Sequence, residues 1–172
     1  MVSHNKAINI IRLSLIRTTK SRVSHVFGRR LFITLGTIMK NESLNEIFRN
    51  MPGNGSDEWE KTFYGHLSEF GEWNIEKFWV FHKALVTIGK QVEEGTEVNR
   101  NLAHTLLYIQ QRVLTHVASH FNPAIDWQFE SINDEQIYEY IERFELAILG
   151  AISGEVIPES SFDIVNPLLS NA

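Results

Sequence analysis

A broad apolar stripe runs through Ile75-Glu-Lys-Phe-Trp-Val-Phe-His-Lys-Ala-Leu-Val-Thr-Ile-Gly89. Its large side chains recur three and four residues apart, as on one face of an α-helix, and Phe81 and Ile88 widen that face. Asn74 directly precedes the stretch and can cap a helix by accepting a hydrogen bond from a backbone N–H of the first turn. A stripe this wide predicts a helix that is buried on more than one side.

Helical patterns also precede this stretch. Ser43 and Glu46 have the spacing of a capping box, which predicts a short helix that begins there and ends near Asn50. A second helix is predicted to end at Gly71, because glycine readily adopts the left-handed conformation that closes a helix. The apolar residues of this second helix are Trp59, Phe63, Leu67 and Phe70.

Two longer helical patterns follow the stretch, the second of them capped by Asn133 or Asp134. Between them, apolar residues near Trp127 alternate with polar ones, which allows a short extended segment. We therefore predict a mainly α fold, a single domain of about five packed helices with at most that one extended segment. The apolar faces of the two helices are Leu102, Leu106, Ile109, Val113 and Val117, and Ile137, Ile141, Phe144, Ile148 and Ile152.

Composition limits the classes of protein to which this chain can belong. Of its 172 residues, 43% are hydrophobic, which is enough for a core without covalent cross-links. It has no cysteine, which excludes disulfides, thiolate catalysis and zinc–thiolate sites and is compatible with a reducing cytoplasm. No apolar run approaches the roughly 18 residues needed to span a bilayer. We expect a cytoplasmic domain.

The charges are distributed unevenly along the chain. The first 30 residues carry seven of the 16 basic residues and no acidic one, so all 21 acidic residues lie further on. We assign residues 1–38 to a basic N-terminal arm and residues 39–172 to the helical domain. Three interpretations of the arm stay open. It is a targeting sequence, a basic helix that binds nucleic acid or anionic lipid, or a stretch that lies upstream of the true start at Met39.

Two of the histidines have the spacing of metal ligands. His116 and His120 are four residues apart on a predicted helix, so both could face one metal ion, but no third ligand follows nearby. Histidines near a helix C-terminus more often interact with the helix dipole. Phosphate-binding, dinucleotide-binding and nucleophile-elbow motifs are absent as well. We expect no metal site, no cofactor and no catalytic residue.

One enzymatic alternative stays open. Arg100-Asn-Leu-Ala-His104, echoed by Arg112-Val-Leu-Thr-His116, resembles the Arg-Asn-then-His motif of the HEPN ribonucleases. That resemblance implies a small helical RNase that cleaves RNA at a dimer interface with Arg100 and His104. Both copies have three residues between Arg and His, where the family usually has four to six. The arm offers a further alternative, a module associated with nucleic acid or with a membrane.

Three segments resemble the bacterial immunity proteins that are encoded beside polymorphic or contact-dependent growth-inhibition toxins. They are Gly71-Glu-Trp-Asn-Ile-Glu-Lys-Phe-Trp-Val-Phe-His-Lys-Ala-Leu85, the turn His120-Phe-Asn-Pro-Ala-Ile-Asp126, and residues 134–154. The resemblance covers about residues 39–157. It implies a non-catalytic protein that binds and neutralises the cognate toxin domain, which in many such systems is a nuclease.

Acidic residues are the expected contacts with such a partner. Many of these toxins have cationic substrate grooves, toward which an acidic surface is steered. The predicted last helix carries a row of carboxylates with only Arg143 as a nearby positive charge, and the same acidity leads us to expect no nucleic-acid binding by residues 39–172. The predicted partner-binding residues are Asp134, Glu135, Glu139 and Glu142, with Glu93, Glu94 and Glu97 as a second candidate surface.

Overall fold

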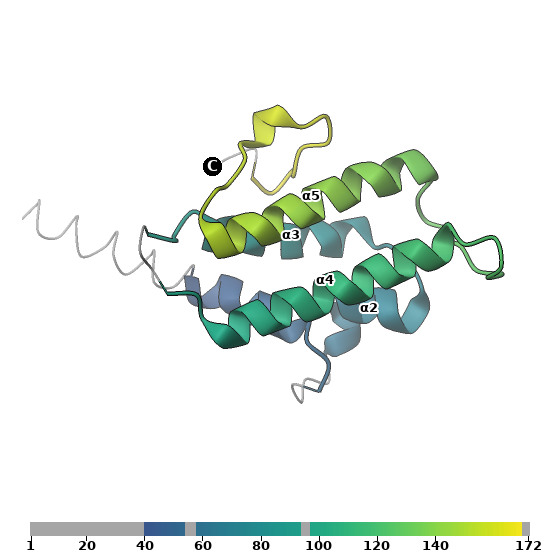
Figure 1. The fold of residues 1–172 in the computed structure, drawn as a ribbon, viewed down its shortest axis with the longest axis horizontal. Helices are drawn as coiled ribbons and strands as arrows, with labels where there is room; N and C mark the ends of the chain where they lie inside the picture. Colours follow the sequence, from purple (N-terminus) through teal and green to yellow (C-terminus); the bar gives the residue numbers. More distant parts are fainter. Residues whose placement is uncertain (1–39, 54–57, 94–96, 170–172) are drawn as a thin grey trace, which may run out of the picture. The chain divides into compact units, whose positions relative to one another are not determined.

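Two helices, α3 (Ile75–Gly89) and α5 (Asp134–Ser153), make the most extensive contact between helices in the fold (Figure 1). Phe78, Phe81 and Leu85 of α3 are fully buried, as the broad apolar stripe predicted. A Cβ added at Gly89 would lie only 2.7 Å from the carbonyl oxygen of Gly150, so the two backbones touch where neither residue has a side chain. This pair forms the centre of the domain.

The computed structural model describes residues 40–53, 58–93 and 97–169. Within them the chain is helical over residues 40–49 and in α2 (Phe63–Phe70), α3, α4 (Arg100–His120) and α5, and two short 3-10 helices are η1 (Trp59–Lys61) and η2 (Glu159–Ser161). The described residues contain no strand, which confirms the predicted mainly α domain. The predicted basic arm, residues 1–38, lies outside the described residues.

Side-chain caps define where the helices begin. Asn74 accepts from the backbone N–H of Lys77 at 3.0 Å, and Asn133 forms a full capping box with Gln136, so both predicted caps are confirmed. The capping box predicted at Ser43 is wrong, because Ser43 lies inside the helical residues 40–49. The spacing of Ser43 and Glu46 therefore gave the wrong start for this helix, which already includes residue 40.

The core is rich in aromatic side chains contributed by several elements. Phe63 of α2 is fully buried, and its ring centroid lies 5.1 Å from that of Trp73 and 5.3 Å from that of Phe78. Phe144 of α5 closes the same cluster at 6.4 Å from Phe63. Ile109 and Val113 of α4 are also fully buried. Large aromatic residues therefore account for much of the apolar area that α2, α3 and α5 remove from water.

Residues 121–133 form the non-helical connection between α4 and α5 and are attached to the core at two points. His120 accepts a hydrogen bond at Nδ1 from the backbone N–H of Phe129 at 3.0 Å, and its ring stacks on that of Phe129. The hydroxyl of Ser131 accepts from the backbone N–H of Trp73 at 3.1 Å and donates to the carbonyl oxygen of Trp73. These bonds fix the path of a connection that has no regular secondary structure.

Residues 154–169 cover one side of α3 and α5, seen as the yellow segment in Figure 1. Gly154 ends α5 in the left-handed conformation, with φ of 82°. Asn166 is fully buried, and its side-chain amide donates to the carbonyl oxygen of Trp79 at 3.1 Å. The C-terminal segment is therefore part of the folded domain.

Candidate partner-binding surface

The predicted acidic row lies on the solvent-facing side of α5. Asp134, Glu135 and Glu142 are exposed, and Glu139 is half-buried. Asp134 is in the first turn of the helix and accepts at Oδ1 from Nε2 of His120 at 3.2 Å. Among the described residues no ion pair involves Glu135, Glu139 or Glu142. The structure therefore brings the row together on one helix and leaves most of its charge unpaired.

Beside this row the surface is hollowed between α4 and α5. The hollow has a volume of about 600 Å³, and Glu139 and Glu142 line it together with Glu145. Tyr138 and Leu149 border it and are 65% and 57% exposed. Neither lysine nor arginine lines this hollow in the described part of the chain. The acidic groove, as we call it, is lined by Gln110, Tyr138, Glu139, Ile141, Glu142, Glu145, Leu146 and Leu149.

Sequence reasoning missed Glu145, Tyr138 and Leu149 as parts of this surface. Glu145 is three residues after Glu142 and so extends the same helix face. Tyr138 and Leu149 each follow directly after a residue of the buried stripe, Ile137 and Ile148. Their positions on the helix are therefore out of phase with that stripe, and this spacing could have predicted that they face solvent.

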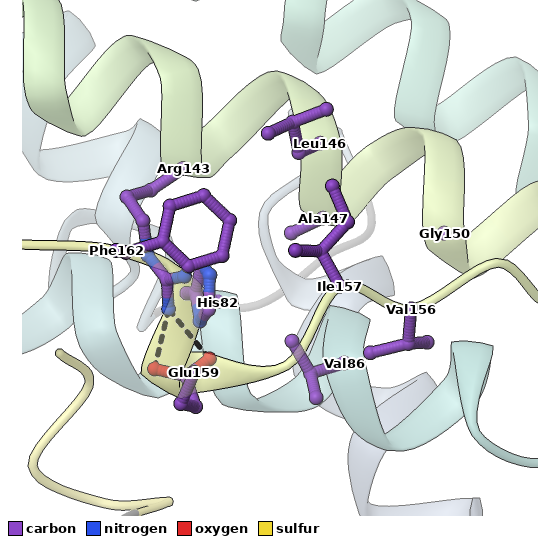
Figure 2. A pocket seen from close by; sticks show the side chains of 10 residues that line it. All are labelled: His82, Val86, Arg143, Leu146, Ala147, Gly150, Val156, Ile157, Glu159 and Phe162. Carbon is purple, nitrogen blue, oxygen red and sulfur yellow. Dashed lines mark hydrogen bonds and ion pairs between the residues drawn. The ribbon is translucent and has the colours of Figure 1, made fainter.

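Arg143 does not supply positive charge to the acidic row, contrary to the expectation from its place in the sequence. Arg143 is 2% exposed, and its side chain points toward the C-terminal segment, where Nη2 donates to both carboxylate oxygens of Glu159 at 2.5 Å (Figure 2). The guanidinium carbon also lies 3.9 Å from the centre of the Phe162 ring. The one basic residue of α5 is therefore neutralised inside the domain.

The pair of Arg143 and Glu159 belongs to a buried polar network. Burial raises the pKa of Glu159, but hydrogen bonds from Arg143 and from the backbone N–H of Asn166, together with the Arg143 charge, outweigh burial and lower that pKa overall. Arg143 and Glu159, with the other residues labelled in Figure 2, line a cavity of about 10 Å³, room for at most one water molecule. This cavity is too small for a ligand or a substrate.

His82 is the titratable imidazole of this network and is 2% exposed. Asn166 donates to the Trp79 carbonyl and accepts at Oδ1 from the backbone N–H of Leu168, so its amide orientation is fixed. Its Nδ2 therefore faces Nδ1 of His82, at 3.0 Å, as a donor. Burial and the positive charge of Arg143 lower the pKa of His82 to about 4. The imidazole is neutral at physiological pH, with Nδ1 accepting.

The second candidate surface is less well formed. Glu93 and Glu97 are exposed, and neither lines the acidic groove. Glu94 lies outside the described residues. Glu139 and Glu142 of the α5 row line a hollow, and we therefore develop the argument on that row.

The residues of the ribonuclease alternative lie along α4. Arg100 and His104 are both exposed, and no hydrogen bond or ring contact joins them in the described structure. Arg112 lies over the ring of Tyr108, with its guanidinium carbon 5.4 Å from the ring centre. His116 is half-buried beside Trp127, and burial, followed by the charge of Arg112, lowers its pKa. The described contacts therefore do not join Arg100 to His104, whereas Arg112 is near enough to His116 for its charge to act on the imidazole.

The described residues hold no group of three or more His, Asp or Glu side chains suited to a metal ion. His120 instead holds the connection to α5 through Phe129 and Asp134. Within the described residues, none of the helices combines the length and hydropathy of a bilayer-spanning segment.

Comparison of the chain with protein families, with curated proteins and with solved structures finds no match. The arguments about function therefore depend on the geometry and charge of the described surface.

Proposed function

We propose that this chain is a non-catalytic immunity protein that acts in the cytoplasm by binding and neutralising a cationic toxin domain. The observation that carries the proposal is the acidic groove, where Glu139, Glu142 and Glu145 line one hollow with no lysine or arginine among its described lining residues. Tyr138 and Leu149 add exposed apolar area beside these carboxylates. Such a surface suits a protein partner that presents positive charge together with apolar side chains.

The internal pairing of Arg143 strengthens this proposal. A solvent-facing arginine on α5 would cancel part of the field of the acidic row, but Arg143 is paired with Glu159 inside the domain. The row therefore attracts cationic surfaces over a distance of about 8 Å at physiological ionic strength. Phosphate groups are repelled by the same field, so the groove favours a basic protein over a nucleic acid.

Neutralisation requires no chemistry by this chain. A nuclease toxin holds the phosphates of its substrate with lysine and arginine, and carboxylates on a rigid helix can occupy the same cationic groove. The toxin is then blocked for as long as the complex lasts. In this mechanism Glu135, Glu139 and Glu142 pair with cationic side chains, and Tyr138 and Leu149 exclude water from those pairs.

A conditional-toxicity screen tests the proposal. Genomic fragments from the organism that encodes this chain are expressed in a bacterial host with and without the full chain. We expect at least one fragment, encoding a basic domain, to stop growth only when the chain is absent. Failure of the chain to rescue growth from any toxic fragment would contradict the proposal.

Charge-reversed variants then locate the contact. The triple variant Glu135→Lys, Glu139→Lys and Glu142→Lys should abolish rescue. A triple variant with the same change in net charge, at the exposed Glu60, Glu93 and Glu97, serves as the control and should rescue growth. The opposite pattern would move the contact to the second candidate surface and exclude the α5 row.

A further inference from the structure

A second hollow lies where the connection between α4 and α5 meets the C-terminal end of α2. Its volume is about 1210 Å³, and its lining includes Phe70, Phe121 and Ile125, which are 59%, 37% and 43% exposed. The ring of Phe121 stacks on that of Tyr138, with 5.3 Å between the centroids and 22° between the planes. We call this the aromatic hollow. Exposed aromatic side chains gathered at a hollow are typical of a protein-binding site.

The aromatic hollow lies next to the acidic groove. Tyr138 borders the groove and stacks on Phe121 of the hollow, and Asp134 belongs both to the acidic row and to the lining of the hollow. The row of carboxylates on α5 thus runs between the two hollows. One partner of ordinary size can contact both.

Charge indicates what kind of group enters this hollow. Its described lining contains four carboxylates and no lysine or arginine. An anionic lipid or a nucleic acid would be repelled there, whereas a cationic side chain would be attracted. Arginine fits best, because its planar guanidinium can pair with a carboxylate and also stack on an aromatic ring. The four carboxylates belong to Glu72, Asp126, Glu130 and Asp134.

The hollow is preformed by contacts within the domain. His120 holds Phe129 of the connection through a backbone hydrogen bond, and Ser131 is bonded to Trp73, so residues 129 and 131 are attached to the core. Gly71, with φ of 64°, lets Trp127 pack directly on the end of α2, because a Cβ at this position would lie 2.9 Å from Nε1 of Trp127. A rigid site loses little conformational entropy when it binds, which favours affinity.

We infer that the aromatic hollow is the anchoring site for the partner and takes an arginine or lysine side chain from a segment of a protein whose neighbouring apolar residues pack on Phe121, Ile125 and Tyr138. This inference rests on the proposed function and adds to it the chemistry of the partner segment. The carboxylates of the α5 row then set the rate of association, and the aromatic hollow sets the lifetime of the complex.

The test uses a display library of short random peptides, selected on the immobilised full chain. We expect the enriched peptides to combine arginine or lysine with apolar residues. Binding of a synthetic enriched peptide, followed by fluorescence anisotropy, should weaken about tenfold or more in the Phe121→Ser and Tyr138→Ser double variant. The control is the Val80→Ser and Leu107→Ser double variant, which removes exposed apolar side chains that line neither the aromatic hollow nor the acidic groove and should keep wild-type affinity.

A second variant keeps the test independent of the aromatic pair. The Asp126→Asn and Glu130→Gln double variant should bind the peptide more weakly and should show a shallower dependence of affinity on salt concentration. Enrichment of acidic or purely apolar peptides would overturn the inference, as would unchanged affinity in both hollow variants. The two proposals can fail separately. If the growth screen is positive, but only the α5 charge reversal abolishes rescue and peptide binding while both hollow variants keep them, the proposed function stands. The aromatic hollow is then excluded as the anchor.

Discussion

Acid should destabilise this domain through one buried imidazole, that of His82. The pKa of His82 is about 4 in the folded chain, against an ordinary value of 6.5. Between these two pH values the unfolded chain binds a proton at His82 that the folded chain does not bind. The free energy of unfolding therefore falls as the pH is lowered through this window. At 1.36 kcal/mol for each unit of pKa, His82 accounts for a loss of about 3 kcal/mol between neutral pH and pH 4.

The contacts of His82 give the structural reason for this loss. A protonated His82 carries N–H donors on both ring nitrogens, but its Nδ1 faces the amide donor of Asn166 at 3.0 Å. The charge of Arg143 further opposes the imidazolium ion. Glu159, whose pKa is lowered from 4.5, also loses its stabilising contribution in acid, but only below that value. Measurements at and above pH 5 therefore exclude most of the Glu159 contribution.

Urea unfolding at several pH values between about 7 and 5 measures this effect by linear extrapolation. The variant His82→Gln keeps a hydrogen-bond acceptor for Asn166 but does not titrate, so its stability should depend less on pH than that of the wild type. Exposed Gln111, which does not titrate, is the control position: Gln111→Ala should leave the wild-type dependence unchanged. Equal pH dependence in the wild type and in His82→Gln would refute the reasoning.

Three further predictions concern the packing and the ends of the helices. Gly89→Ala should lower the free energy of unfolding by about 1 to 3 kcal/mol, measured by urea unfolding, because the new Cβ would lie 2.7 Å from the Gly150 carbonyl oxygen; an unchanged value would disprove this close approach of α3 and α5. Asn133→Ala should cost about 1 kcal/mol through loss of the α5 cap, visible as a lower midpoint of thermal unfolding by circular dichroism; Asn133→Ser should restore most of it. Glu159→Gln should lower the free energy of unfolding by about 3 kcal/mol, because it leaves the Arg143 charge buried without its counterion. In a double-mutant cycle, adding Arg143→Met should recover most of that stability. Additive effects of the two substitutions would show that the two side chains are not coupled.

The helices could be predicted because their signals are local. Three- and four-residue spacing of apolar side chains identified α3 and α5, and Gly71 and Asn133 marked an end and a start. The start predicted at Ser43 was wrong, because two residues with the right spacing occur inside a helix as well as at its end.

The site could be predicted only in part. The acidic row follows from the periodicity of α5, but the internal pairing of Arg143 depends on Glu159, in a segment that leaves the helix and returns across it. In the same way, the stacking of Phe121 on Tyr138 depends on the path of the connection, which Ser131 and His120 determine through contacts with the core. Contacts of this kind join residues far apart in sequence and have no periodic signal.

The most direct measurement is the association rate between this chain and the toxin domain recovered in the growth screen, followed by stopped-flow fluorescence at increasing salt concentration. We predict that the wild-type rate falls steeply with salt and that the variant with lysine at Glu135, Glu139 and Glu142 associates at least tenfold more slowly at low salt, with little salt dependence. Equal rates and equal salt dependence in the two proteins would contradict the role of the acidic face of α5.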